Sequence, residues 1–145
     1  MSDILQALAS LVVKDEVSLG GLPAATQTLA LAMAHATLPP GSVLNEREVN
    51  EALKAALAGP LCWLATDHVE LRRWLVDAGW LVRDGFGREY RALPHAALAA
   101  ELQPLARQLA TVELKSWVAA ERERKHHERA ARHKEWLARK GDASD

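Results

Sequence analysis

Apolar residues recur at helical spacing near the start of the chain. Residues 1–16 carry them three and four positions apart, which predicts an amphipathic helix. These side chains are Ile4, Leu5, Leu8, Leu11 and Val12. A loop through Gly20 and Gly21 follows. Pro23 suits the first position of a second helix, which we expect to run to about Ala36.

The next segment has the clearest helix signals in the chain. Asn45 and Glu48 have the spacing of a capping box, in which each side chain accepts a hydrogen bond from the other residue's backbone N–H. An apolar stripe follows at Val49, Leu53 and Leu57. Because Gly59-Pro60 then ends the pattern, the sequence predicts a helix over residues 45–58.

A second well-marked helix is predicted over residues 67–78. An apolar connector, residues 61–65, separates it from the first, and Thr66 is expected to cap it. Its core-facing stripe consists of Leu71, Trp74, Leu75 and Ala78. That stripe leaves the arginines of this helix, Arg72 and Arg73, on outward positions, and Gly79 ends the helix.

A β-hairpin is predicted directly after this helix. Residues 80–83 and 88–91 are the strands, and Asp84-Gly85-Phe86-Gly87 is the turn. A short strand at residues 42–44 would give the hairpin a third partner. Two capped helices followed by such a hairpin have the order of a winged helix-turn-helix.

The C-terminal part reads as a helical extension over residues 93–140, followed by a disordered tail at 141–145. Pro94 and Pro104 each suit the start of a helical segment. An apolar seam runs through Leu98, Leu102, Leu105, Leu109 and Val112. It spans about two heptads, too few for an autonomous coiled coil, so docking of the seam on the domain or on a second subunit is expected. The extension is predicted to end in a long C-terminal helix.

Composition supports a mainly α fold with a small β-hairpin: residues 1–16 as an N-terminal helix, 17–92 as a winged-helix domain, then the extension. Ala and Leu dominate the 145 residues, and strand-favouring types are scarce. The net charge of −1 conceals an asymmetry. Residues 42–92 carry seven bases against eight acids, whereas residues 113–140 carry nine against five. The electrostatic argument for a nucleic-acid partner is therefore weaker than the argument from element order.

Several classes of protein are disfavoured. The chain has no stretch of roughly 18 to 20 apolar residues and no secretion signal, so a cytoplasmic location without membrane contact is expected. The lone Cys62 lies among apolar residues and is predicted to be a buried, inert thiol. No phosphate-binding loop, nucleophile elbow or acid–base pair is present, so neither enzymatic activity nor a cofactor is expected.

The residues that favour DNA binding lie on the second helix and the hairpin. The second helix of a helix-turn-helix enters the major groove, and the hairpin touches the backbone or the minor groove. The candidate side chains are Thr66, His68, Arg72, Arg73, Arg83, Arg88 and Arg91.

A structural role for the two helix arginines is an equal alternative. Arg73 and Asp77 are four residues apart, and Arg72 has acids within reach on the neighbouring helix. Either arginine, bonded to Glu48, Asn50 or Asp77, would tie the two helices together. Glu70 and Asp77 share the outward surface and would repel phosphate.

Three histidines, His126, His127 and His133, lie in the basic tail. Glu123 and His127 have the four-residue spacing of a helical metal pair. Since no further convergent ligand accompanies them, a solvated basic helix explains them better, and no metal is expected.

Two motifs carry a resemblance to a known family. They are Glu46-Arg47-Glu48-Val49-Asn50 and the run from Leu71-Arg72-Arg73 to Gly79, continued by Leu81, Arg83, Gly87 and Tyr90. Over about residues 17–92 the chain resembles a bacterial family of unknown function whose members are regarded as transcriptional regulators. The resemblance implies a winged-helix fold, although the link from Asn50 to Asp67 is longer here than in the family pattern.

Two functions follow as hypotheses. The first is a transcriptional regulator that binds double-stranded DNA as a homodimer, paired through its N-terminal or C-terminal helices. The second is a winged-helix module for protein interaction or assembly, without DNA contact. Neither the DNA sequence bound nor a small-molecule effector can be read from the chain.

Overall fold

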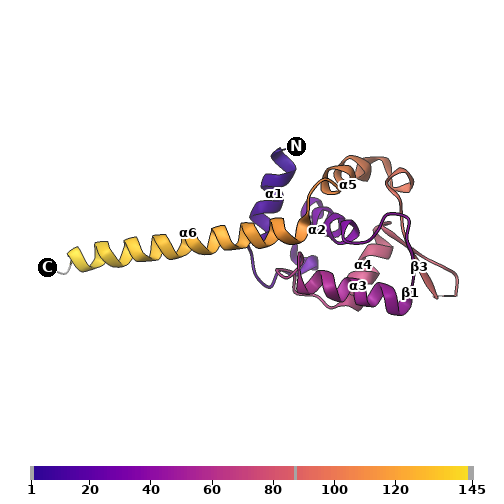
Figure 1. Ribbon diagram of the computed structural model, residues 1–145, viewed down its shortest axis with the longest axis horizontal. Helices are drawn as coiled ribbons and strands as arrows, with labels where there is room; N and C mark the ends of the chain where they lie inside the picture. Colours follow the sequence, from indigo (N-terminus) through magenta and orange to yellow (C-terminus); the bar gives the residue numbers. More distant parts are fainter. Residues whose placement is uncertain (1, 87, 144–145) are drawn as a thin grey trace.

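Helices and one antiparallel sheet form the protein. The computed structural model describes residues 2–86 and 88–143 (Figure 1). In chain order the elements are α1 (Ser2–Val12), the 3-10 turn η1 (Leu19–Gly21), α2 (Ala24–Ala36), β1 (Val43–Asn45), α3 (Glu46–Ala58), α4 (His68–Asp77), β2 (Leu81–Arg83), β3 (Glu89–Ala92), the 3-10 turns η2 (His95–Ala97) and η3 (Ala100–Leu102), α5 (Gln103–Leu109) and α6 (Leu114–Ala143). The predicted mainly α fold with a small β-hairpin is confirmed.

The sheet has the strand order β1-β3-β2, so the last strand lies in the middle. Leu44 pairs with Tyr90, which also pairs with Arg83, and both pairings are antiparallel. The hairpin therefore has a third strand, β1, in a segment too short for the sequence pattern to assign. Along β3, Tyr90 and Ala92 are buried and the alternate residues are exposed, as the period of two requires. Gly87, in the turn predicted at 84–87, lies outside the described residues.

The core lies mainly among the helices and reaches the inner face of the sheet at Leu81, Tyr90 and Ala92. The stripe of α3 and that of α4 meet there, and Val49, Leu53, Leu71 and Leu75 are completely buried. The capping box predicted for α3 is confirmed, because Asn45 Oδ1 accepts from the Glu48 N–H at 2.8 Å and Glu48 Oε1 accepts from the Asn45 N–H at 3.0 Å. It fixes the start of α3 immediately after β1.

The connector between α3 and α4 is held by backbone pairing rather than by a helix of its own. The Val17 N–H donates to the Trp63 carbonyl at 3.0 Å, and the Ala65 N–H donates to the Val17 carbonyl at 2.8 Å. These two bonds fasten the connector to the segment that follows α1.

The prediction that Cys62 is buried is wrong, since its side chain is exposed. Its neighbours Leu61 and Trp63 occupy the interior instead, and the Trp63 indole N–H donates to the Pro60 carbonyl at 2.9 Å. In a connector without helical or strand periodicity, an apolar neighbourhood in the sequence does not determine which side chain points inward.

Pro94 and Pro104 lie at the starts of η2 and α5, as predicted, and the expected long C-terminal helix is α6. The apolar seam of residues 98–112, however, does not lie on one helix. That segment contains η3 and α5, and α6 begins only at Leu114. Leu98 and Leu109 of the seam are both buried, but Leu98 lies just after η2 and Leu109 is the last residue of α5. A turn at the end of α5 makes the break, and Glu113 Oε2 then accepts the Ser116 N–H at 2.8 Å at the start of α6. Of the predicted tail, residues 144 and 145 lie outside the described residues, and α6 includes residues 141–143.

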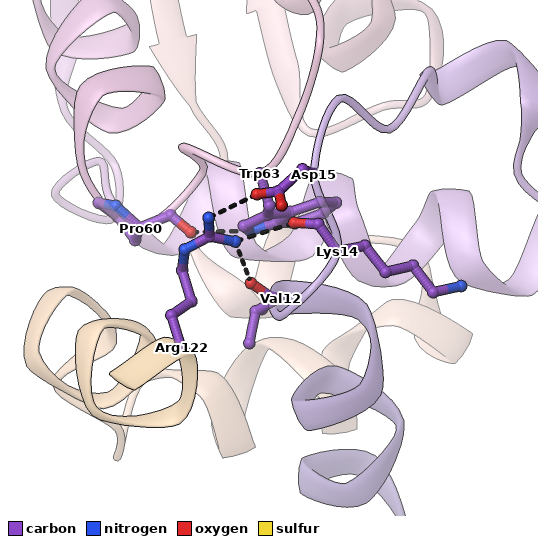
Figure 2. A network of polar contacts seen from close by, with 6 residues as sticks. All are labelled: Val12, Lys14, Asp15, Pro60, Trp63 and Arg122. Carbon is purple, nitrogen blue, oxygen red and sulfur yellow. Dashed lines mark hydrogen bonds and ion pairs between the residues drawn. The ribbon is translucent and has the colours of Figure 1, made fainter. Parts of the chain in front are cut away.

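α6 is fastened to the end of α1 and then leaves the body of the protein, as Figure 1 shows. The Arg122 guanidinium donates to the Val12 carbonyl at 2.9 Å, to the Lys14 carbonyl at 2.8 Å and to the Asp15 carboxylate at 2.6 Å (Figure 2). Two orphan carbonyls at the end of α1 thus gain a cationic donor. The hydrogen bond from Arg122, and then its charge, lower the pKa of Asp15 below its ordinary value.

Among the described residues, no helix has both the length and the apolar character that a membrane span requires. The longest helix, α6, is polar around most of its circumference.

A histidine lies within the core, beside the sheet. His35 is 2% exposed, its Nε2 lies 2.8 Å from the Leu93 carbonyl, and its ring centroid is 5.1 Å from that of Trp80. Burial lowers its pKa below the ordinary 6.5, against the opposing effect of the bond to Leu93. The neutral ring, with a proton on Nε2, is therefore the form that the fold accommodates.

Stability should accordingly fall as the solution is acidified below about pH 6.5. The unfolded chain binds a proton at this histidine before the folded chain does, so the contribution is fully present above the unfolded pKa. It decreases toward the lower, folded pKa, by at most about 1.4 kcal/mol per pH unit. Urea unfolding at several pH values measures it. His35→Gln, which keeps an N–H donor, should remove this pH-dependent part of the stability. His133→Gln, on the exposed part of α6, should not. Equal pH profiles for wild type and both variants would contradict the assignment to His35.

Candidate nucleic-acid interface

α4 is the helix that carries the predicted recognition residues, and it begins one residue later than expected. Asp67, not Thr66, is its N-cap, because Asp67 Oδ1 accepts the Glu70 N–H at 2.8 Å. A carboxylate suits this position, since it also interacts with the positive end of the helix dipole. Thr66 and His68 are half-buried at this end of α4. The acidic cap makes that helix end less attractive to phosphate than a threonine cap would.

Arg72 is held inside the monomer. One guanidinium N–H donates to Asn50 Oδ1 of α3 at 2.5 Å, and the same nitrogen lies 3.6 Å from a Glu46 carboxylate oxygen. The guanidinium carbon is 5.1 Å from the centre of the Tyr90 ring, and the side chain is only 16% exposed. Arg72 therefore joins α3, α4 and β3, which is the structural alternative expected from the sequence, with Asn50 as the partner.

Arg73, its neighbour, is exposed and forms no hydrogen bond or ion pair with any described residue. Two adjacent helix residues differ by about 100° around the axis, so one can face a partner helix while the other faces solvent. The predicted pair with Asp77 is not formed. Arg73 is the helix arginine that is available to a partner.

The hairpin presents Arg83, Arg88 and Arg91 to solvent. Its turn is built on Asp84, whose Oδ1 accepts the N–H groups of Phe86 and Arg88 at 3.1 and 2.9 Å. Phe86 is 85% exposed at the tip. Sequence reasoning assigned this aromatic residue only to the turn, although an aromatic side chain at the tip of a short hairpin has no core to enter.

The outer face of the sheet has a basic centre with apolar flanks. Arg91 of β3 pairs with Val43 on one side and Val82 on the other, so the three side chains form a row across the strands. The valines are 54% and 49% exposed. This row is an exposed surface of mixed character, suited either to a sugar-phosphate backbone or to a protein.

Two hollows divide the predicted residues into groups. The first, of about 330 Å³, lies between α4 and the hairpin and is lined by Val69, Arg72, Arg73, Val76, Asp77, Arg83 and Tyr90. The second, of about 770 Å³, lies between α3 and the hairpin turn and is lined by Asn45, Glu46, Arg47, Asn50, Glu51, Lys54, Phe86 and Arg88. Thr66, His68 and Arg91 line neither hollow. The structure thus brings Arg73 and Arg83 together and places Arg88 with α3.

Residues 23–92 match the profile of a bacterial protein family. The family is described as "Uncharacterized protein conserved in bacteria (DUF2087)". The match covers the elements from α2 to β3, which include both hollows. The expected resemblance to a bacterial family of unknown function is confirmed to this extent. Neither the comparison with curated proteins nor that with solved structures gives a match.

Two basic residues of this surface were not among those predicted. Arg47 and Lys54 of α3 line the second hollow with Arg88. They are seven residues apart, which places them on one face of a helix, and this spacing was a signal available in the sequence. Lys54 lies 3.5 Å from Glu51, a solvated pair that leaves little net charge there.

In residues 2–86 and 88–143, no three or more His, Cys, Asp or Glu side chains gather where they could hold a metal ion. In the tail, His127 Nε2 and Glu123 lie 2.9 Å apart, an exposed pair within one helix.

Proposed function

We propose that the protein is a transcriptional regulator of bacterial type that binds double-stranded DNA through a winged helix-turn-helix. The motif consists of β1, α3, α4, β2 and β3, with α4 as the recognition helix and the hairpin as the wing. Support comes from the element order, from the three-stranded sheet and from the contact of α4 with β2, the first strand of the hairpin. A cytoplasmic location belongs to the same proposal.

The observation that carries the proposal is the position of Arg73 and Arg83 at the shared hollow between α4 and the hairpin. Both guanidinium groups are exposed, and neither is neutralised by a hydrogen bond to a carboxylate. Arginine at such sites bonds phosphate oxygens or guanine edges. Arg72 takes no direct part; it sets the angle between α4 and α3 and is a positioning residue.

Salt dependence of duplex binding tests the proposal. Binding of a random-sequence duplex, followed by fluorescence anisotropy, should weaken steeply as salt rises. Arg73→Ala combined with Arg83→Ala should lower the slope of log affinity against log salt by about 1.8, because each lost phosphate contact contributes roughly 0.9. Lys14→Ala combined with Arg107→Ala removes the same charge from exposed positions elsewhere and should leave the slope unchanged.

The proposal fails if the wild-type protein does not bind duplex at low salt, or if the two double variants behave alike. The second candidate, an interaction module without DNA contact, would then be favoured. It is supported by the exposed Val43, Val82 and Phe86 and by the slight acidic excess over residues 42–92. Homodimerisation through α1 or α6 stays a prediction, to be checked by sedimentation.

A further inference from the structure

Two of the hairpin arginines, Arg83 and Arg91, lie on opposite faces of the sheet. Arg83 pairs with Tyr90, and paired residues share a face, whereas the next residue along a strand points to the other face. Arg83 therefore lies on the face of the buried Tyr90 and lines the hollow beside α4. Arg91 lies on the other face. A duplex held by Arg73 and Arg83 leaves Arg91 for a different partner.

The face that carries Arg91, which we name the outer sheet face, consists of exposed residues from all three strands. They are Val43, Asn45, Val82, Glu89 and Arg91. The two valines flank Arg91, and Glu89 is two residues away on the same strand. The side chains of Glu89 and Arg91 form no hydrogen bond or ion pair with any residue of the described ranges. The face thus presents one free acid and one free base.

Glu89 and Arg91 have the arrangement that a two-fold contact requires. Residues two apart on a strand lie on one face, roughly 6.6 Å from each other. If β3 of a second copy runs antiparallel over β3 and the two strands meet at Tyr90, Glu89 of each copy faces Arg91 of the other. One contact then forms two pairs of opposite charge. A parallel arrangement would instead place like charges against each other.

Other kinds of partner use this face less completely. Phosphate would be attracted by Arg91 and repelled by Glu89, which lies close to it on the same face. A membrane surface requires a broad apolar face, and Val43 and Val82 are the only apolar residues here. A second copy satisfies both charges, and the valines shield the pairs from water.

We propose that the outer sheet face joins two copies of this chain into a two-fold dimer, in which Glu89 of each copy pairs with Arg91 of the other. Face-to-face sheets with nearly aligned strands are a common packing. The face is small, so the association is weak and reversible. The surface is distinct from α1 and α6, and the proposal does not depend on DNA binding. Because Arg72 of α4 lies against the Tyr90 ring, on the opposite face, both copies of α4 stay accessible in the dimer.

The test uses two charge reversals in the full chain. Glu89→Arg leaves two bases on the face and Arg91→Glu leaves two acids, so each variant alone should raise the dissociation constant of the dimer at least about tenfold. An equimolar mixture of the two variants should form a mixed dimer with nearly wild-type affinity, because both of its pairs again have opposite charges. Sedimentation velocity over a concentration series measures these constants.

Glu101→Arg and Arg107→Glu are the matched controls, since they change the net charge equally at exposed positions outside the sheet. They should leave the dissociation constant unchanged, alone or mixed. Since the reversals on the sheet are also at exposed positions, those variants should melt like wild type at concentrations below the dissociation constant.

A wild-type protein that remains a monomer at its highest soluble concentration would overturn the proposal. So would a dimer that survives both reversals, as expected for pairing through α1 or α6, or a mixture that associates no better than its two components. If the wild type is a monomer and Arg91→Glu abolishes duplex binding, the face contacts DNA and only the dimer is rejected. If the mixture dimerises and the wild type binds no duplex, the dimer holds and the DNA-binding proposal fails.

Discussion

Replacing Arg72 by alanine should lower the free energy of unfolding by about 2 to 3 kcal/mol. The variant loses a charge-assisted hydrogen bond to Asn50 and the contact with the Tyr90 ring, and it leaves the Asn50 amide without this donor. Urea denaturation followed by circular dichroism measures the change. Arg72→Lys should recover only part of it, because an ammonium group cannot reproduce the planar contact with the ring.

Arg73→Ala is the matched control, one residue further along the same helix. Arg73 is exposed and unpaired among the described residues, so its loss should change stability by less than about 0.5 kcal/mol. We therefore expect Arg72→Ala to lower stability and Arg73→Ala to weaken duplex binding, which would distinguish the roles of the two arginines. If Arg72→Ala instead left stability unchanged and abolished duplex binding, Arg72 would be a DNA contact and not a positioning residue.

Trp63→Ala should lower the free energy of unfolding further, by about 3 to 5 kcal/mol. The indole is completely buried, and its N–H satisfies the Pro60 carbonyl. Its removal leaves a cavity beneath the connector and frees the segment that pairs with Val17. Thermal unfolding followed by calorimetry would report the loss.

Trp136→Ala provides the control for the indole itself. Trp136 is 50% exposed on the outer part of α6, so that variant should unfold at nearly the wild-type temperature. Since Trp63→Ala can fail to fold altogether, Trp63→Phe is the milder test, with a smaller loss in the same direction. A wild-type melting temperature for Trp63→Phe would show that the connector does not depend on this side chain.

The elements with strong local signals could be predicted from the sequence, because those signals are set by neighbouring residues. Asn45 and Glu48 form the capping box between themselves, so α3 starts where the sequence indicates. The Gly79 backbone has φ of +84°, a conformation that favours glycine, and α4 ends just before it. The hairpin could be predicted because apolar and polar residues alternate on either side of a glycine-containing turn.

The sequence predictions failed where contacts between residues far apart in the chain determine the structure. Thr66 and Asp67 are both good caps, and only the geometry of the connector selects Asp67. Leu98 and Leu109 have the spacing of one helix, yet Leu98 lies just after η2 and only Leu109 lies in α5. The sequence offered Asn50 as a partner for either helix arginine, and only the packing of α3 on α4 assigns it to Arg72.

The contacts of Arg122 with the residues at the end of α1 link the two terminal helices of the protein. α6 ends at Ala143, so 21 of its residues follow Arg122. At about 1.5 Å per residue they extend roughly 32 Å, and residues 126–141 are exposed. The direction of this segment is set by carbonyls of Val12 and Lys14, more than a hundred residues earlier in the chain. Truncation of the first fifteen residues would therefore remove the contacts that fix the direction of α6. A shortened protein has to retain both the end of α1 and Arg122 to keep that direction.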